Sequence, residues 1–184
     1  APEFAAAARV ALVGAPAQVM LTDGIAAAYR DGAGRIAAHA APVLETASHG
    51  RNALPNIYQT SAADFLRSHA LGEEVFGPLG LIVTTGSDAE MLDLAEALEG
   101  QLTATLQMDA GDMALARQLM AVLQRKAGRV LANGWPTGVE VADAMVHGGP
   151  YPASTNFGAT SVGTLAIRRF LRPVCYQNLP DALL

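Results

Sequence analysis

The chain has 184 residues and a formal net charge of −5 at pH 7, with 51% hydrophobic and 16% charged residues. This balance is typical of a folded domain rather than a disordered segment, and a chain of this length predicts one domain over residues 1–184. The acidic charge argues against a nucleic-acid partner, and no apolar run reaches the roughly 18 residues of a membrane span. A single cysteine excludes an internal disulfide, which favours a reducing, cytoplasmic location.

The N-terminal part of the chain predicts two helices. A stripe of apolar residues from Phe4 to Leu12 predicts the first, which the following Gly-Ala-Pro ends. The second is expected over residues 24–30, with Thr22 or Asp23 as its N-cap. Asp31-Gly32 is expected to close this second helix, because glycine commonly follows the last helical turn. A weak helix and then a loop are expected over residues 32–50.

Strand signals follow. Residues 52–60 predict a strand, in which Pro55 favours an edge position because proline cannot donate to a strand ladder. Ser61 is expected to cap a short helix over residues 62–68. The apolar run over residues 79–85 then predicts a buried strand.

Helices and strands alternate in the middle of the chain. A helix that begins at Ser87 or Asp88 leads to a strand over residues 102–106. The longest expected helix covers residues 112–126, where Gly128 ends it, and another strand covers residues 129–133. This order predicts a layered α/β fold with mainly parallel strands.

The last third changes in composition. Residues 134–163 are rich in Gly, Pro, Ser and Thr, and only residues 139–146 are able to form a helix there. A loop this long in a compact domain is functional or lies at an interface. A final helix over residues 162–169 and a short strand over residues 174–176 are expected to follow.

A short motif lies directly before the strand at residue 79. It reads Leu71-Gly72-Glu73-Glu74-Val75-Phe76-Gly77-Pro78 and resembles the Glu-x-Phe-Gly-Pro motif of the aldehyde dehydrogenase superfamily. The resemblance implies that Glu74 accepts hydrogen bonds from the nicotinamide ribose of NADP or NAD, and that Phe76 packs against the nicotinamide. A carboxylate is a good acceptor for a diol, and a rigid ring orients a planar cofactor. A polar turn with a buried phenylalanine is the alternative for the motif alone.

The resemblance covers nearly the whole chain, because the later strands and helices keep the superfamily's order. It implies a three-layer α/β sandwich with a mainly parallel sheet, and places residues 1–184 in the C-terminal part of the catalytic domain. Residues 133–141 and 147–154 resemble the subgroup that oxidises 2,5-dioxopentanoate to 2-oxoglutarate. In relatives, the loop after Asn133 lines the aldehyde tunnel. The resulting candidates for the wall of that tunnel are Trp135, Pro136, Thr137 and Gly138. For Trp135, a role as a core anchor stays open.

The resemblance also implies what this segment does not contain. In the superfamily, the nucleophilic cysteine, the glutamate general base and the cofactor-binding domain precede this region. Cys175 is the only thiol of the chain and lacks the nucleophile's sequence context, so a buried, structural role is expected for it. The chain alone is therefore expected to be inactive, as part of an NAD(P)-dependent enzyme. NAD and NADP both stay open, because the contacts that separate them lie elsewhere.

Other residues that are chemically able to bind a metal or an anion give weaker predictions. The four histidines and Cys175 have no metal-ligand spacing, so no metal site is expected. His147-Gly148-Gly149 offers backbone amides to an anion or forms a plain turn. Arg168, Arg169 and Arg172 are expected to complement a helix dipole and an interface.

Alternatives remain for the partner and the function. The resemblance implies a homo-oligomer in which the strand at residues 174–176 pairs across a subunit boundary. Another short aldehyde, such as succinic semialdehyde, is an alternative substrate. A non-catalytic assembly or binding module with the same fold is the alternative from a different class.

Overall fold

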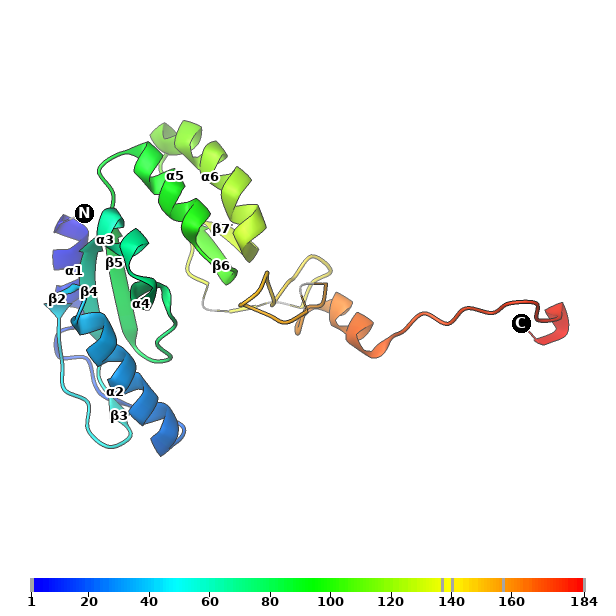
Figure 1. Cartoon of the computed structure of the whole chain (residues 1–184), viewed down its shortest axis with the longest axis horizontal. Coiled ribbons are helices and arrows are strands. Elements are labelled where there is room, and N and C mark those ends of the chain that lie inside the picture. The colour runs from blue at the N-terminus through cyan, green and yellow to red at the C-terminus, as the bar shows by residue number, and fades with distance from the viewer. Residues whose placement is uncertain (1, 137, 140, 157, 184) are drawn as a thin grey trace. The chain divides into compact units, whose positions relative to one another are not determined.

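The computed structural model describes residues 2–136, 138–139, 141–156 and 158–183 (Figure 1). The chain divides into two compact units, residues 1–97 and residues 98–184. The expectation of one domain over the whole chain stays a prediction.

The first unit is built on a three-stranded sheet in the order β2-β4-β5. The central strand β4 (Asn56–Ser61) pairs antiparallel with β2 (Ala41–Leu44) and parallel with β5 (Leu79–Thr84). A separate two-stranded ribbon joins β1 (Gln18–Val19) to β3 (Asn52–Ala53).

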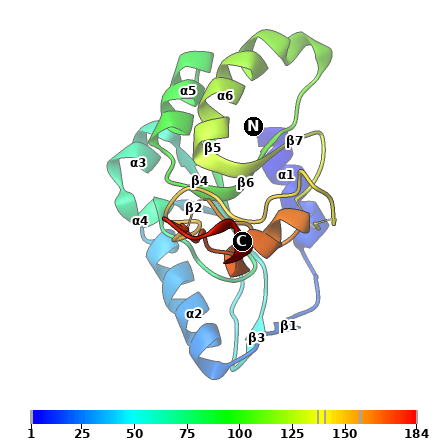
Figure 2. The ribbon, with the colours of Figure 1, turned by 90° about the vertical axis from the view of Figure 1, so that its right-hand side faces the viewer.

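Helices cover both faces of the three-stranded sheet (Figure 2). On one face lies α1 (Pro2–Leu12). On the other lie α2 (Asp23–Ala37), α3 (Ala62–Arg67) and α4 (His69–Gly72). The helix α5 (Asp88–Ala97) packs against α3. The expected α/β fold is confirmed, and the first unit has three layers.

The core of the first unit lies between the sheet and α2. Ile36, Tyr58 and Leu71 are buried there, and Val75 and Leu79 pack against them. The hydroxyls of Thr22, Ser61 and Ser87 each accept a hydrogen bond from the backbone N–H three residues later, at 3.1 to 3.2 Å. These caps confirm the helix starts that the sequence predicts.

Three expectations for the first unit are wrong. The second helix does not close at Asp31-Gly32 but continues to Ala37, because Gly32 is buried against Val75 and serves close packing rather than a turn. The strand expected over residues 52–60 is broken at Leu54-Pro55, so that Pro55 precedes β4 and leaves it free to be the central strand. The strand β2 lies where the sequence predicts a loop after a weak helix, so that expectation is wrong as well.

The second unit contains a parallel pair of strands, β6 (Gln101–Leu106) and β7 (Ala127–Ala132). The helix α6 (Met113–Lys126) connects them and packs on both, after a short 3-10 turn, η1 (Ala110–Asp112). Gly128 lies inside β7 instead of ending α6, because the backbone of Gly148 leaves no room for a side chain there. Among the described residues of this unit, β6 and β7 form a two-stranded parallel sheet.

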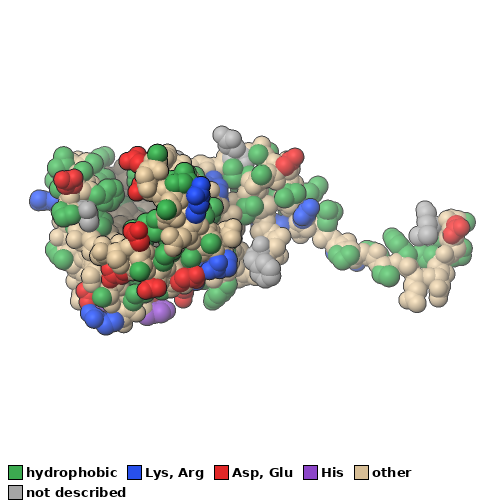
Figure 3. All heavy atoms as spheres, turned by 90° about the horizontal axis from the view of Figure 1, so that it is seen from above, with side chains coloured by type: hydrophobic (Ala, Val, Ile, Leu, Met, Phe, Trp, Pro, Cys, Tyr) green, Lys and Arg blue, Asp and Glu red, His purple; other side chains and the backbone are tan. Residues whose placement is uncertain are grey.

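The C-terminal part has less regular structure than expected. The described residues of the range 139–146 form no helix, and the last helix is a 3-10 helix, η2 (Thr164–Phe170). Residues 174–176 are extended but pair with no described strand, and a 3-10 turn, η3 (Asp181–Leu183), follows. Hydrophobic side chains are exposed along this segment (Figure 3). The most exposed of them are Ile167, Phe170, Leu171, Tyr176 and Leu183, and Val174 is exposed as well.

None of the helices formed by the described residues has the length and apolar character needed to cross a membrane.

The buried Tyr58 predicts a pH dependence of stability. Burial, and secondly the hydrogen bond to Glu45 at 3.2 Å, raise the pKa of the Tyr58 phenol from 10.0 to about 12. Below pH 10 the phenol is neutral in the folded and unfolded chain alike. Between pH 10 and about 12 the unfolded chain ionises first, so the free energy of unfolding should fall by roughly 1 to 2 kcal/mol as the pH rises.

The variant Tyr58→Phe tests this expectation. It loses one hydrogen bond, so it should be less stable than the parent at neutral pH by about 1 kcal/mol. Between pH 9 and 12, the free energy of unfolding measured by urea denaturation should nevertheless fall less steeply with pH for the variant than for the parent. A decline as steep as that of the parent would contradict the assignment.

Candidate functional site

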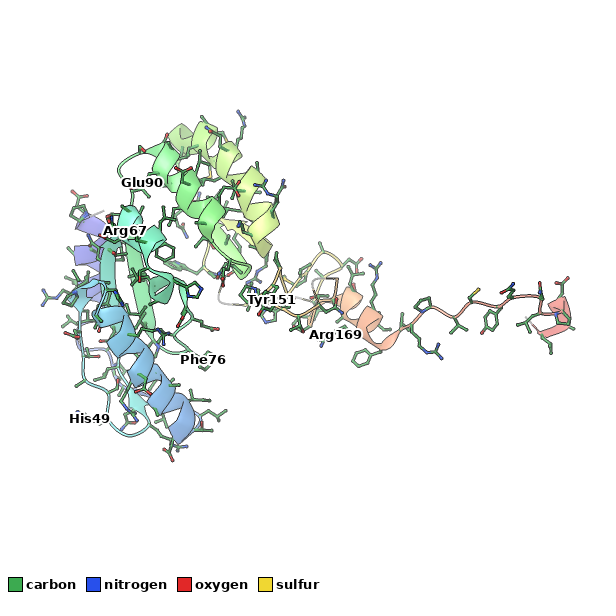
Figure 4. All side chains as sticks on the ribbon, viewed as in Figure 1. His49, Arg67, Phe76, Glu90, Tyr151 and Arg169 are labelled. Carbon is green, nitrogen blue, oxygen red and sulfur yellow. The ribbon has the colours of Figure 1, made fainter. Side chains whose placement is uncertain are left out.

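Glu74 and Phe76 lie in an extended segment, residues 73–77, between the end of α4 and the start of β5. Phe76 is 68% exposed and projects away from the ribbon (Figure 4), so the alternative of a buried phenylalanine is wrong. Glu74 is also exposed, and the ion pairs among the described residues do not include it. Its carboxylate is therefore accessible to a ligand.

The alternate residues of the same segment face α2. Arg35 Nε lies 3.1 Å from Glu73 Oε2, and Val75 packs on Gly32. The two residues between these contacts, Glu74 and Phe76, are both exposed, as a common ligand would require.

The far end of the segment is held by Tyr29. Its buried ring contacts the backbone of Gly77 so closely that a side chain at Gly77 would collide with it. The Tyr29 hydroxyl donates to the carbonyl oxygen of Leu54 at 2.8 Å, with that of Pro78 at 3.2 Å. Burial raises the pKa of Tyr29, which keeps the phenol a neutral donor.

Asn56 completes this arrangement. Its side-chain amide donates to the Tyr29 hydroxyl at 2.9 Å, and its backbone N–H donates to the Pro78 carbonyl oxygen at 2.9 Å. The amide oxygen accepts from the backbone N–H of Thr46 at 2.7 Å. Sequence patterns did not single out Tyr29 or Asn56. The one signal available is an asparagine directly after a proline at the start of a strand.

The candidates for the tunnel wall lie in the second unit, in the loop after β7. Trp135 is 74% exposed, so it does not anchor the core, and Pro136 and Gly138 are exposed as well. Thr137 lies outside the described residues. Arg129 Nη1 donates to the carbonyl oxygen of Gly138 at 2.6 Å, which ties this loop to its own strand.

Asn133 joins the ends of β6 and β7. Its amide oxygen accepts from the Met108 N–H at 2.8 Å, and its amide nitrogen donates to the Met108 carbonyl oxygen at 2.9 Å. The backbone of Asn133 is left-handed, with φ 51°, and turns the chain into the Trp135 loop. An apolar cavity of about 500 Å³ lies beside Asn133 between α6 and the strands, but Trp135, Pro136 and Gly138 do not line it.

Two further expectations are decided by the structure. In the segment His147-Gly148-Gly149, the N–H of His147 donates to Thr160 Oγ1 at 2.8 Å and that of Gly149 to Ser154 Oγ at 3.3 Å. These amides are used within the loop, which favours the plain turn over anion binding. Cys175 is exposed rather than buried, because no described strand covers its extended segment. Within the described ranges, no three His, Cys, Asp or Glu side chains are placed to share a metal ion.

Comparison with known proteins identifies relatives of this chain. It is 55% identical over 187 residues to alpha-ketoglutaric semialdehyde dehydrogenase 2 of Azospirillum brasilense, covering 98% of this chain and 35% of that protein. It is 45% identical over 177 residues to alpha-ketoglutaric semialdehyde dehydrogenase of Acinetobacter baylyi, covering 91% of this chain and 33% of that protein. The chain thus spans about a third of the length of these relatives. No family model matches it.

The fold also has solved counterparts. A betaine aldehyde dehydrogenase of Staphylococcus aureus, in complex with NAD+, superimposes with a TM-score of 0.62 at 16% identity. The match covers 83% of this chain and 30% of that one. At this identity the likeness establishes the fold alone.

Two substitutions of Asn133 separate the contribution of its side-chain hydrogen bonds from that of its left-handed backbone. Asn133→Gly removes both hydrogen bonds to Met108 but tolerates the left-handed backbone, so it should cost about 1 to 2 kcal/mol. Asn133→Ala removes the same bonds and also strains the backbone, so it should cost about 1 to 2 kcal/mol more. Urea denaturation measures both differences. Because Trp135 is the only tryptophan, acrylamide quenching of its fluorescence reports on the loop and should increase in both variants.

Equal stability of the two variants would contradict the role of the left-handed backbone. Unchanged stability of Asn133→Gly would contradict the role of the side-chain amide.

Proposed function

Because this chain belongs to the aldehyde dehydrogenase superfamily, we propose that it forms the C-terminal part of the catalytic domain of an NAD(P)-dependent semialdehyde dehydrogenase. The proposed reaction is the oxidation of 2,5-dioxopentanoate to 2-oxoglutarate. The proposed substrate is inferred from the 55% identity, over 98% of this chain, to a protein named for α-ketoglutaric semialdehyde. The second relative, at 45% identity, has the same substrate in its name.

Glu74 and Phe76 fit a nicotinamide riboside. The Glu74 carboxylate is exposed and accepts hydrogen bonds only, which suits the two hydroxyls of a ribose. The exposed ring of Phe76 offers a flat apolar surface to the nicotinamide. When bound, the cofactor supplies the hydride acceptor of the oxidation. The role of the two side chains is to orient it, with NAD and NADP both compatible.

The reacting groups are proposed to come from outside this chain. Cys175, its only thiol, lies exposed on an extended segment, with Sγ 3.9 Å from the carbonyl oxygen of Tyr176 and no base among its hydrogen-bond partners. An activated cysteine nucleophile needs such a base or another group that favours the thiolate. We therefore propose that the nucleophile lies in the preceding part of the enzyme. The proposed wall of the aldehyde tunnel remains Trp135, Pro136, Thr137 and Gly138.

The proposed assembly is a cytoplasmic homo-oligomer. The segment at residues 174–176 presents exposed apolar side chains, Val174 and Tyr176, and pairs with no strand of the described residues. An extended segment of this kind is suited to pair with a strand of another subunit.

Substrate preference of the full-length enzyme tests the proposed reaction. Catalytic efficiency should be highest for 2,5-dioxopentanoate, lower for succinic semialdehyde and lowest for a simple alkyl aldehyde. Steady-state rates of nicotinamide reduction measure all three. A preference for succinic semialdehyde would favour the alternative substrate, and a preference for the alkyl aldehyde would exclude a keto-acid substrate. A full-length protein with no dehydrogenase activity that forms stable assemblies would favour the non-catalytic module.

Cofactor contacts are tested by the variant Glu74→Gln in the same enzyme. The amide keeps the size of the side chain but loses charge-assisted acceptance, so kcat/KM for the cofactor should fall about 10- to 100-fold. Asp93→Asn, which neutralises an exposed carboxylate on α5, is the matched control and should retain parental kinetics. Equal kinetics of the Glu74→Gln variant and the parent would remove Glu74 from the site.

The 184-residue chain by itself should reduce no NAD or NADP in the presence of 2,5-dioxopentanoate, because the nucleophile is proposed to lie outside it. Absorbance of the reduced nicotinamide measures this directly. Turnover by the chain that is lost in Cys175→Ser would overturn this part of the proposal.

A further inference from the structure

We propose that α2 is the template that orients Glu74 and Phe76, with Gly32 and Tyr29 as its positioning residues. This inference rests on the proposed cofactor role of Glu74 and Phe76. Neither positioning residue touches the cofactor in this proposal. Each acts through the backbone of the extended segment, residues 73–77.

The contacts between α2 and the segment follow one helix face. Tyr29, Gly32 and Arg35 are spaced three residues apart, which places them along the same side of a helix. They meet the segment in reverse order, at Gly77, Val75 and Glu73 respectively. Every second residue of the segment is therefore fixed to α2, and the intervening pair, Glu74 and Phe76, is left exposed.

Gly32 sets the distance of closest approach. A Cβ atom on this residue would lie 2.8 Å from Val75 Cγ1 and 3.0 Å from Val75 Cγ2. Valine is branched at Cβ and has few alternative rotamers, so its side chain cannot swing aside without cost. Any residue larger than glycine at position 32 must push the segment away from the helix. Such a shift would carry Glu74 and Phe76 with it.

Tyr29 fixes the other end. Its ring occupies the space beside Gly77, whose φ of 153° suits glycine. Its hydroxyl reaches the Pro78 carbonyl oxygen, which also accepts the backbone N–H of Asn56. The segment is thus bound at its start through Glu73, in the middle through Val75 and at its end through Gly77-Pro78. A segment held at three points orders little further when a ligand binds, which favours affinity.

The neighbouring Gly34 provides a matched control. It lies in the same helix, is exposed and has no atom within 4 Å of an added Cβ. Gly34→Ala should therefore leave the segment in place and slightly stabilise α2. Gly32→Ala makes the same chemical change two residues earlier and collides with Val75. The double variant Gly32→Ala/Val75→Ala removes the colliding methyl groups and should restore the segment.

The first measurement uses the 184-residue chain and needs no cofactor. The amides that report on the segment are those of Leu79 and Asn56, which donate to the carbonyl oxygens of Gly77 and Pro78 at 2.8 and 2.9 Å. Their hydrogen–deuterium exchange should become faster in Gly32→Ala, remain parental in Gly34→Ala, and return toward the parental rate in the double variant. The same exchange at residues 57–61 of β4, the central strand of the same unit, checks that this unit stays folded. Parental exchange of the segment in a folded Gly32→Ala chain would overturn the template role.

The second measurement uses the full-length enzyme. Gly32→Ala should lower kcat/KM for the cofactor about 10- to 100-fold while the KM for the aldehyde changes little, and the double variant should recover most of the loss. A purely structural role would reduce the amount of folded enzyme but not the kinetic constants per active site. Tyr29→Phe, which keeps the ring and removes the hydroxyl, should show a smaller loss of the same kind.

Amide exchange and enzyme kinetics together distinguish a failure of the positioning role from a failure of the proposed function. Suppose that exchange becomes faster in Gly32→Ala while Glu74→Gln has parental kinetics. Then α2 holds the segment but the segment binds no cofactor. This result would overturn both the proposed cofactor role and the inference that rests on it. A kinetic defect in Glu74→Gln together with parental kinetics of Gly32→Ala would leave the proposed function intact and overturn the positioning role alone.

Discussion

The packing of Val75 on Gly32 determines how closely the segment with Glu74 and Phe76 approaches the body of the first unit. The same helix face continues into Ile36, which is buried with Tyr58 and Leu71. One face of α2 therefore serves the core and the segment together. A change that loosens the core is expected to move the segment as well, because close-packed interiors transmit small displacements.

Asparagines secure the strand ends in both units. At the start of β4, the Asn56 amide accepts from the Thr46 N–H and donates to the Tyr29 hydroxyl. At the end of β7, the Asn133 amide accepts from and donates to the backbone of Met108. A side-chain amide offers a donor and an acceptor side by side, so it can continue backbone pairing beyond the last strand residue. The loop after Asn133 carries Trp135, and Asn56 holds Pro78, which follows Phe76 and Gly77 in the chain.

Local signals allowed much of the fold to be predicted, and long-range contacts account for what was missed. The caps at Thr22, Ser61 and Ser87 act within one helical turn, so the sequence around them is sufficient. Gly32 carries the same local signal whether it ends a helix or admits a neighbouring chain, and only its contact with Val75 decides between them. The motif led to Glu74 and Phe76. Tyr29 and Asn56 belong to no motif, because their roles arise from hydrogen bonds between segments that are distant in sequence.

At the C-terminus, the exposure of Cys175 and the lack of a paired strand at residues 174–176 among the described residues are connected. A strand at residues 174–176 and a buried Cys175 both require a neighbouring strand, and the described residues place none beside this segment. An alternating apolar pattern records that a segment is suited to pairing, but it does not say which chain supplies the partner. If a second subunit pairs with Val174 to Tyr176, the same contact would form the strand and cover the thiol. The proposed oligomer would therefore protect the backbone amides of residues 174–176 and the Cys175 thiol together.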